Sequence, residues 1–341
     1  MNSTGSKRRI IFIDALRIIA CFLVILYHAR YNIYDYVANG GRISYFEHFI
    51  LNISFLVGRF AVPIFFILSG YFAFKNDCMV FPFLRKRFER LGLPLLFWAT
   101  IYTLTFSNSQ NFLYDLLTIK QAPHLWYIYA LLGMTVLIPV ISNFIMNCKR
   151  NELLFYIFLG GVTMIFNGNF FDSFSLIHTN HQGMLFTNPI SALLNLSGFI
   201  TYFFIGAFIR IFSLKKVVPY FLLCFSILIM ALIYFYMDID ISGLIAYNSI
   251  FTAMIAVAFI LITQQVCDCV NLSESRIIQI RALGEMTFGI YLVHYLIMRY
   301  LYLFNITVWE NCLITSIITM LISFILIKFI KHIPYSKYII G

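Results

Sequence analysis

A histidine and an arginine stand inside one long apolar run near the start of the chain, over residues 9–28. The imidazole of His28 titrates near neutral pH, so it can act as a general base or as a nucleophile. Arg17 precedes it by eleven residues, about three helical turns, so in a helix both side chains leave the same face about 16 Å apart. Asp14 stands one turn before Arg17, where an ion pair between the two is sterically allowed. Charged groups are costly in a bilayer, so we expect this face to point into protein.

Each of these three residues also has a purely structural interpretation. His28 can be a hydrogen-bonded interior histidine, and Arg17 can be held in a structural ion pair with Asp14, because buried arginines need such partners. The face shared with Arg17 favours a functional role for His28, while both roles of Arg17 stay open. The predicted catalytic residues are therefore His28, Arg17 and Asp14.

A basic segment between two apolar runs supplies a second group of candidates, namely Arg85, Lys86, Arg87 and Arg90. Guanidinium groups bind phosphates well, so this segment is predicted to bind a phosphate-bearing cofactor. It is equally interpreted as a determinant of membrane topology, because positively charged loops stay on the cytoplasmic side.

Polar residues at the ends of two other apolar runs are candidates for substrate binding. Arg59 either binds substrate or extends its guanidinium to the lipid headgroups. His124 and Trp126 begin a later run and either contact an acceptor or belong to an aromatic belt at the membrane interface.

A late apolar run carries a stripe of spaced residues, Thr287, Tyr291, His294 and Met298. Their spacing places them on one face of a helix, and a polar stripe within lipid must face protein. His294 is then either a partner in the chemistry or an interhelical hydrogen-bonding group. Tyr291 and His294 join the predicted substrate-binding residues.

The loop over residues 169–189 mixes aromatic and amide side chains. Such chemistry suits either a sugar ligand or an interfacial position. His178 and His181 in this loop lack a third ligand, so we predict no metal site.

The elements that must position these side chains are membrane helices. Of 341 residues, 61% are hydrophobic and only 11% are charged, whereas charged residues make up about a quarter of soluble domains. We therefore expect a polytopic integral membrane protein. The net charge of +10 is spread over the loops between apolar runs, which indicates topology and not a nucleic-acid partner. Seven scattered cysteines predict no disulfide framework.

Ten apolar runs are long enough to cross a bilayer. They are residues 10–28, 53–74, 91–107, 124–146, 152–168, 190–209, 217–237, 244–264, 286–304 and 311–330. Most of the 24 Lys and Arg residues fall in loops on one side of these spans, which the positive-inside rule makes cytoplasmic. The prediction is an all-α bundle of about ten transmembrane helices with both termini cytoplasmic.

The chain shows no internal repeat, so we predict a single membrane domain over residues 1–341, with residues 1–9 as a cytoplasmic tail. The basic start followed by apolar residues is similar to a signal peptide. Because charges interrupt its apolar core and no small-residue cleavage site follows, we interpret it as a retained anchor.

Five motifs together resemble the acyltransferase-3 family of membrane acyltransferases. They are Asp14-Ala-Leu-Arg17 with His28 after ten intervening residues, the run from Val62 to Tyr71, the basic run from Phe83 to Pro94, the run from His124 to Tyr129, and the run from Leu283 to His294. They occur in the family's order and extend over nearly the whole chain. Within the family the chain is most similar to stand-alone O-acetyltransferases, such as those that modify enterobacterial common antigen. Ala15 departs from the Gly or Asn that is frequent there.

The resemblance implies an O-acyltransferase, and most simply an O-acetyltransferase, of a bacterial plasma membrane. It would take an acetyl group from cytoplasmic acetyl-CoA, bound at the basic segment, and pass it to a hydroxyl of a cell-surface glycan or lipid-linked oligosaccharide. His28 would act as base or acyl carrier. The bilayer would be a partner, and a homo-oligomer is left open.

A glycan or lipid transporter of the same architecture is the alternative, because ten helices with buried charges also describe a translocation path. The missing repeat and the motifs favour the enzyme.

Overall fold

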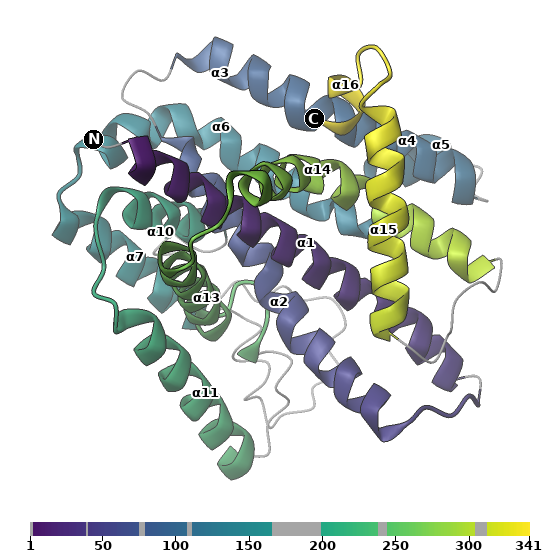
Figure 1. The fold of residues 1–341 in the computed structure, drawn as a ribbon, viewed down its shortest axis with the longest axis horizontal. Helices are drawn as coiled ribbons and strands as arrows, with labels where there is room; N and C mark the ends of the chain where they lie inside the picture. Colours follow the sequence, from purple (N-terminus) through teal and green to yellow (C-terminus); the bar gives the residue numbers. More distant parts are fainter. Residues whose placement is uncertain are drawn as a thin grey trace. The chain divides into compact units, whose positions relative to one another are not determined.

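A computed structural model shows a helical chain (Figure 1). It describes residues 3–38, 40–74, 79–107, 111–165, 199–237, 244–303 and 312–341. No strand occurs within these ranges, so the predicted all-α fold class is confirmed for the described chain. The loop over residues 169–189, with His178 and His181, lies outside them, and its sugar contact stays a prediction.

Five helical segments are long and apolar enough to cross a membrane. They are residues Ile11–Tyr31 of α1 (Ser3–Ala38), α2 (Tyr45–Ala73), Pro123–Asn147, α13 (Ile250–Cys269) and α15 (Cys312–Ile330). The segment Pro123–Asn147 joins the short 3-10 turn η2 (Pro123–Leu125) to α6 (Trp126–Asn147). These segments confirm a membrane protein with several spanning helices.

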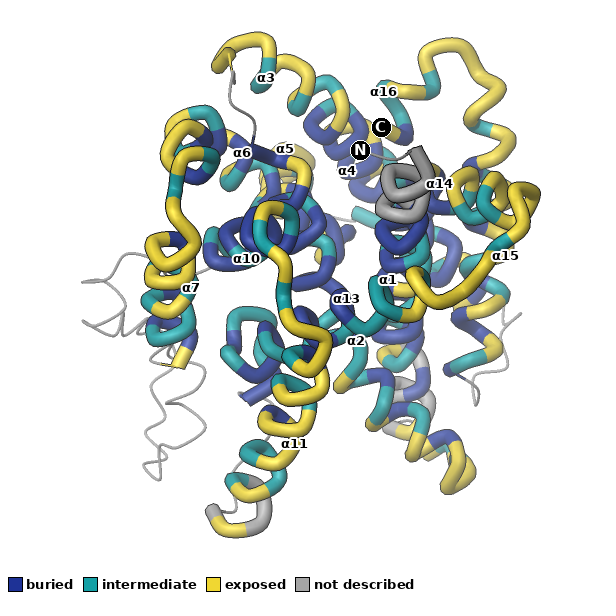
Figure 2. The backbone as a smooth tube through the Cα atoms, turned by 60° about the vertical axis from the view of Figure 1, so that its left-hand side comes forward, coloured by how far each residue is buried: buried dark blue, intermediate teal, exposed yellow. Residues whose placement is uncertain are grey.

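Exposed apolar side chains on α15 show how such a helix meets lipid. Ile317, Leu321 and Ile325 follow one another at about one-turn intervals and are 44%, 56% and 52% exposed. A stripe of this kind is stable against hydrocarbon and unstable against water. In Figure 2, exposed residues recur along α11 and α15, whereas buried residues dominate the central part of α1.

Each of the ten predicted spans overlaps a helix, and within the described part of the chain five segments are long and apolar enough to cross a membrane. The number of crossings and the cytoplasmic position of the termini stay predictions. Three helices extend well beyond their predicted spans, and one of them is α2, which begins at Tyr45, eight residues early. α1 begins at Ser3 and α14 (Glu274–Leu303) begins twelve residues early, because a helix ends where a residue breaks it and not where an apolar run ends.

The helices form two compact units, each assembled from segments that are far apart in sequence. The first comprises residues 1–16, 59–78 and 140–271, and the second comprises residues 17–58, 79–139 and 272–341. α1, α2 and α6 contribute a segment to each unit. A single membrane domain over residues 1–341 stays a prediction.

In the first unit, α7 (Arg150–Ile165) packs along α10 (Ile200–Ile211), and α11 (Val218–Met237) packs along α13 (Figure 1). Glycines allow α2 and α10 to approach closely. A Cβ at Gly70 would overlap the backbone of Phe203, and a Cβ at Gly206 would overlap the carbonyl of Ile67. Close backbone contact of this kind supplies packing energy where the hydrophobic effect cannot act between helices.

In the second unit, α14 packs along α15 and against α4 (Leu93–Phe106). α3 (Val80–Arg87) continues into α4 through a π-helical turn, η1 (Phe88–Gly92), and α5 (Phe112–Leu117) follows α4. A last short helix, α16 (Lys337–Ile340), contacts η1, α4 and α14. The indole Nε1 of Trp98 in α4 donates a 2.9 Å hydrogen bond to the Ile339 carbonyl, which fixes α16 in place.

Candidate functional site

Three histidines from three separate helical segments meet inside the second unit. His28 comes from α1, His124 from η2 and His294 from α14. Their ring centroids are 5.0 Å apart between His124 and His294, 5.5 Å between His28 and His294, and 6.1 Å between His28 and His124. The sequence predicted each of them separately, and the structure places them in one group, which we name the histidine cluster.

The local sequence explains how His124 and His294 are held. Pro123 opens η2, a position where the missing amide of proline costs nothing, and the turn places His124 directly before α6. The hydroxyl of Tyr291 donates to the carbonyl of His124 and so ties η2 to α14. The carbonyl of Tyr291 lies 2.7 Å from Nδ1 of His294.

The contact between Nδ1 of His294 and the Tyr291 carbonyl determines which ring nitrogen carries the hydrogen when His294 is neutral. A carbonyl oxygen only accepts hydrogen bonds, so Nδ1 of His294 must carry the hydrogen. Nε2 of the same neutral ring is then an acceptor with an available lone pair. His294 is therefore arranged to accept a proton or a hydroxyl hydrogen bond at Nε2.

Buried ring nitrogens of the cluster lack hydrogen-bond partners. Nε2 of His294 and both ring nitrogens of His124 have none among the described residues, although His124 is 2% exposed and His294 is 0% exposed. Leaving a buried polar group unpaired costs about 1–3 kcal/mol. A buried group left unpaired in a folded protein needs an explanation, and a catalytic role is one of the explanations. His28 is only half-buried, so it is the member of the cluster that is best placed to receive a ligand.

Three tyrosine rings surround His124. The ring centroids of Tyr102, Tyr291 and Tyr295 lie 5.2, 5.7 and 5.0 Å from that of His124. Tyr295 also lies 5.5 Å from His28. Aromatic walls of this kind exclude water and strengthen the electrostatic interactions inside them.

Sequence reasoning identified Tyr291 but missed Tyr102 and Tyr295. Tyr295 directly follows His294 and so falls off the helix face that the polar stripe defined. Tyr102 stands in an apolar run without any charged residue at helical spacing that would have drawn attention to it. The weak signal available was a hydroxyl within a predicted span, since such a group needs a partner.

The other two predicted catalytic residues, Asp14 and Arg17, precede His28 on α1. Asp14 is buried, at 4% exposed, and Arg17 is half-buried. Asp14 falls in the first unit and Arg17 in the second. Their ion pair and their roles stay predictions.

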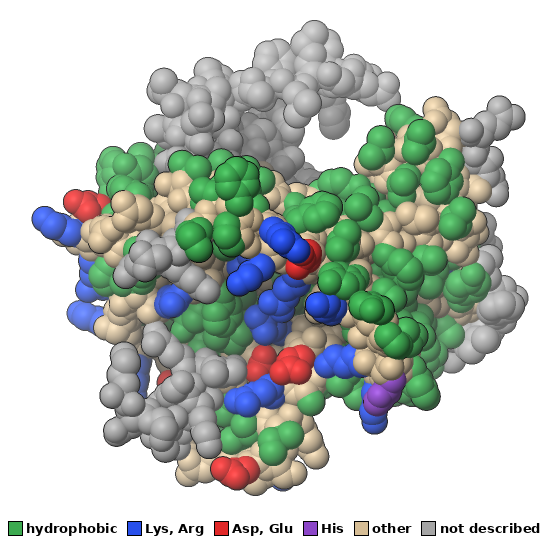
Figure 3. Space-filling view, turned by 90° about the horizontal axis from the view of Figure 1, so that it is seen from above, with side chains coloured by type: hydrophobic (Ala, Val, Ile, Leu, Met, Phe, Trp, Pro, Cys, Tyr) green, Lys and Arg blue, Asp and Glu red, His purple; other side chains and the backbone are tan. Residues whose placement is uncertain are grey.

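The basic segment lies on α3 and η1, in the same unit as the histidine cluster. Arg85 donates a 2.9 Å hydrogen bond to Glu89, and this bond raises the pKa of the Arg85 guanidinium because the carboxylate favours its charged form. Arg87 ends α3 and Arg90 lies within the π-helical turn. π-Helical turns frequently occur at functional sites. In the view of Figure 3, Lys and Arg side chains lie at the surface with a few acidic ones among them.

Two predicted substrate-binding residues lie outside the cluster. Arg59 belongs to the first unit, where its guanidinium carbon lies 4.8 Å from the centroid of the Tyr247 ring. Trp126 is half-buried and begins α6 two residues after His124. Within the described chain, no group of three His, Cys, Asp or Glu residues is arranged to hold a metal ion.

Comparisons with known proteins give one match. The family model Acyl_transf_3, described as an acyltransferase domain, matches residues 10–328. No curated protein and no solved structure matched the chain. The family match extends over both units and includes the histidine cluster and the basic segment.

Proposed function

Because the chain belongs to the acyltransferase-3 family and is a membrane acyltransferase, we propose that it is an O-acetyltransferase that uses acetyl-CoA. The acceptor is a hydroxyl of a cell-surface glycan or of its lipid-linked precursor, in a bacterial plasma membrane. The resemblance to stand-alone O-acetyltransferases supports this narrower function.

The observation that carries the proposal is the histidine cluster with its unpaired nitrogens. A hydroxyl group both donates and accepts a hydrogen bond, so it can donate to an unprotonated ring nitrogen of His28 while its oxygen accepts from the protonated ring nitrogen of His124. An imidazole base contributes about 10²- to 10⁴-fold to such a reaction. The cluster would therefore orient the acceptor hydroxyl and supply the base that removes its proton.

In the direct reaction, His28 removes the proton of the acceptor hydroxyl as its oxygen attacks the thioester carbonyl carbon. The carbon–oxygen bond forms, the carbon–sulfur bond breaks, and the proton passes from His28 to the departing thiolate of CoA. In the two-step variant, a ring nitrogen of His28 takes the acetyl group first and passes it to the hydroxyl. The basic segment would bind the phosphates of CoA through Arg87 and Arg90, whose planar guanidinium groups suit phosphate.

The test uses the full-length protein in liposomes with radiolabelled acetyl-CoA and a surface glycan preparation. We expect His28→Ala to lower acetyl transfer by at least about 100-fold, and His332→Ala, at an exposed position, to leave it unchanged. Retained transfer in His28→Ala would overturn the role of His28.

Cells that carry His28→Ala distinguish the enzyme from the transporter. If their surface glycan keeps its amount but loses its O-acetyl groups, the enzyme is supported. If the glycan itself disappears from the surface, the chain moves the glycan and the proposal is wrong.

A further inference from the structure

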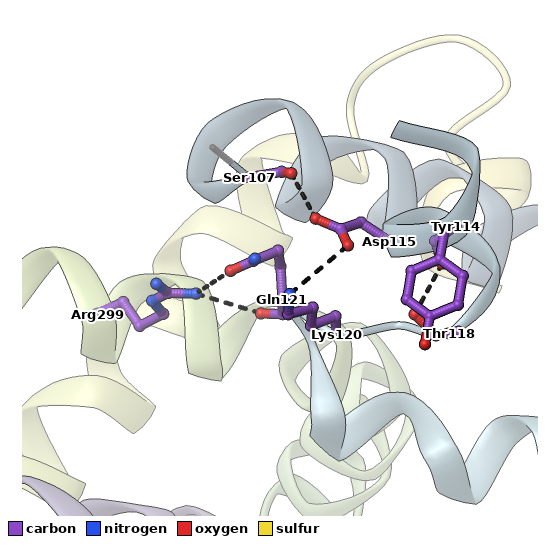
Figure 4. Close-up of polar contacts among 7 residues, drawn as sticks. All are labelled: Ser107, Tyr114, Asp115, Thr118, Lys120, Gln121 and Arg299. Atoms are coloured by element: carbon purple, nitrogen blue, oxygen red, sulfur yellow. Dashed lines mark hydrogen bonds and ion pairs between the residues drawn. The ribbon is translucent and has the colours of Figure 1, made fainter. Parts of the chain in front are cut away.

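An arginine next to the histidine cluster is held in place by neutral groups. Arg299 lies on α14 and is half-buried. Its guanidinium carbon lies 3.7 Å from the centroid of the Phe106 ring. Its Nη1 donates hydrogen bonds of 3.3 and 3.4 Å to the backbone and side-chain oxygens of Gln121 (Figure 4). The guanidinium is therefore fixed in one orientation, and none of the described residues supplies a counter-ion.

The carboxylate in the same region is engaged elsewhere. Asp115 is 1% exposed, accepts a 2.5 Å hydrogen bond from the Ser107 hydroxyl, and lies 4.0 Å from Nζ of Lys120 (Figure 4). Across the described ranges, no acidic group forms an ion pair with Arg299. A cation that is partly removed from water and unpaired is unfavourable, and an anionic ligand relieves that cost.

Arg299 and Phe106 each stand one helical turn after a tyrosine whose ring contacts the histidine cluster. Arg299 follows Tyr295 by four residues, about 6 Å along one face of α14, and Tyr295 contacts both His28 and His124. Phe106 stands one turn after Tyr102, whose ring contacts His124. Arg299 thus lies about one helical turn beyond the cluster.

The basic segment lies toward the opposite end of α14. Gly341, after α16, lies against the side chain of Phe288 and the carbonyl of Arg90. Phe288 precedes Arg299 by eleven residues, about 16 Å along α14, and His294 falls between them. An anion at Arg299 would therefore be separate from CoA phosphates bound at Arg87 and Arg90.

We infer that Arg299 binds an anionic group, a carboxylate or a phosphate, of the acceptor. This inference rests on the proposed function for the identity of the ligand, and it narrows the acceptor to an acidic sugar or a phosphate-linked sugar precursor. A planar guanidinium pairs with either group through two parallel hydrogen bonds. The acceptor hydroxyl would then lie at the cluster while its anionic group is held one turn away.

Binding is tested without turnover. The purified full-length protein is heated in detergent with glucuronate, glucose 1-phosphate or glucose. We expect the two anions, but not glucose, to raise the unfolding temperature, and their relative effects identify carboxylate or phosphate as the preferred group. Arg299→Gln should abolish this shift, whereas Arg276→Gln, at an exposed position of the same helix, should preserve it. Absence of an anion-specific shift in the unaltered protein would overturn the inference.

If Arg299→Gln does not fold, Arg299→Lys supplies the test. It keeps the charge but loses the planar pair of donors, so we expect a weaker shift that requires about tenfold more anion. An unchanged concentration dependence in Arg299→Lys would show that the anion binds elsewhere.

Selectivity between acceptors then distinguishes a role of Arg299 in binding the acceptor from a role only in stabilising the fold. For paired glucuronide and glucoside acceptors, the unaltered protein should prefer the acid by about 10- to 100-fold in KM. Arg299→Gln should lose this preference while its acetyl-CoA KM stays unchanged. If the unaltered protein transfers no acetyl group, the proposed function fails, and the unfolding experiment still decides the inference.

Discussion

The hydroxyl of Tyr102 links two backbone groups of α14 beside the histidine cluster. It donates a 3.0 Å hydrogen bond to the Leu292 carbonyl and accepts a 2.8 Å hydrogen bond from the Leu296 amide. These groups stand four residues apart and face each other across one helical turn. His294 lies between them in sequence, so the hydroxyl shapes the turn of α14 that carries this histidine.

We predict that Tyr102→Phe destabilises the protein and slows acetyl transfer. Tyr102 is 0% exposed, so the lost oxygen is not replaced by bulk water. Two hydrogen bonds of about 0.5–1.5 kcal/mol each give a cost of about 1–3 kcal/mol. Without the hydroxyl, the Leu296 amide can instead donate directly to the Leu292 carbonyl. The cost in stability is then smaller, but the ring of His294 moves and kcat falls.

The assay measures thermal unfolding in detergent and kinetics in liposomes on the same preparations. Tyr129→Phe is the matched control, because Tyr129 is 39% exposed on α6. We expect lower stability, a lower kcat or both for Tyr102→Phe, with no change in the KM for acetyl-CoA. Unchanged stability together with unchanged kcat would show that the bridge neither supports α14 nor orients His294.

Two further predictions concern helix packing and the donor site. Gly206→Ala should lower stability by about 1–3 kcal/mol in a thermal-unfolding assay, because its Cβ would overlap the backbone of α2 and overpacking strains both helices. The control is Gly133→Ala, whose Cβ would have nothing within 4 Å. It should be neutral or slightly stabilising. Arg87→Gln should raise the KM for acetyl-CoA about tenfold with kcat largely retained, whereas Lys215→Gln on another basic loop should not. An unchanged KM for Arg87→Gln in the liposome assay would favour the topological interpretation of the basic segment.

The helical nature of the fold was predictable from the sequence because apolar runs of this length have few stable alternatives in a membrane. The two compact units were not predictable. α1, α2 and α6 each pass through both units, and no change in composition marks the point on α1 where one unit gives way to the other. Unit boundaries inside a helix depend on long-range packing, which a local pattern does not reveal.

The candidate site was predictable one residue at a time. His28, His124 and His294 each stood out as polar groups in or beside an apolar run. Their meeting depends on contacts such as that between Tyr291 and His124, which are 167 residues apart in sequence. Arg299 stands inside the predicted span over residues 286–304 as an isolated basic residue. That the described residues around it, Gln121 and Phe106, supply no carboxylate becomes visible only in the folded chain.

The order of groups along α14 bears on how transfer is arranged. Phe288, beside the basic segment, precedes His294 by six residues, about 9 Å of helix, and Arg299 follows His294 by five, about 7.5 Å. One rigid helix therefore sets the spacing between the proposed donor site, the histidine cluster and the proposed anion site. Because these spacings are fixed by helix geometry and not by a loop, a donor bound at the basic segment and an acceptor bound at Arg299 would both have their reacting atoms held near the histidines. Such positioning reduces the entropy cost of bringing two substrates together, which would be the main task of the proposed enzyme because its donor, acetyl-CoA, would already be an activated thioester.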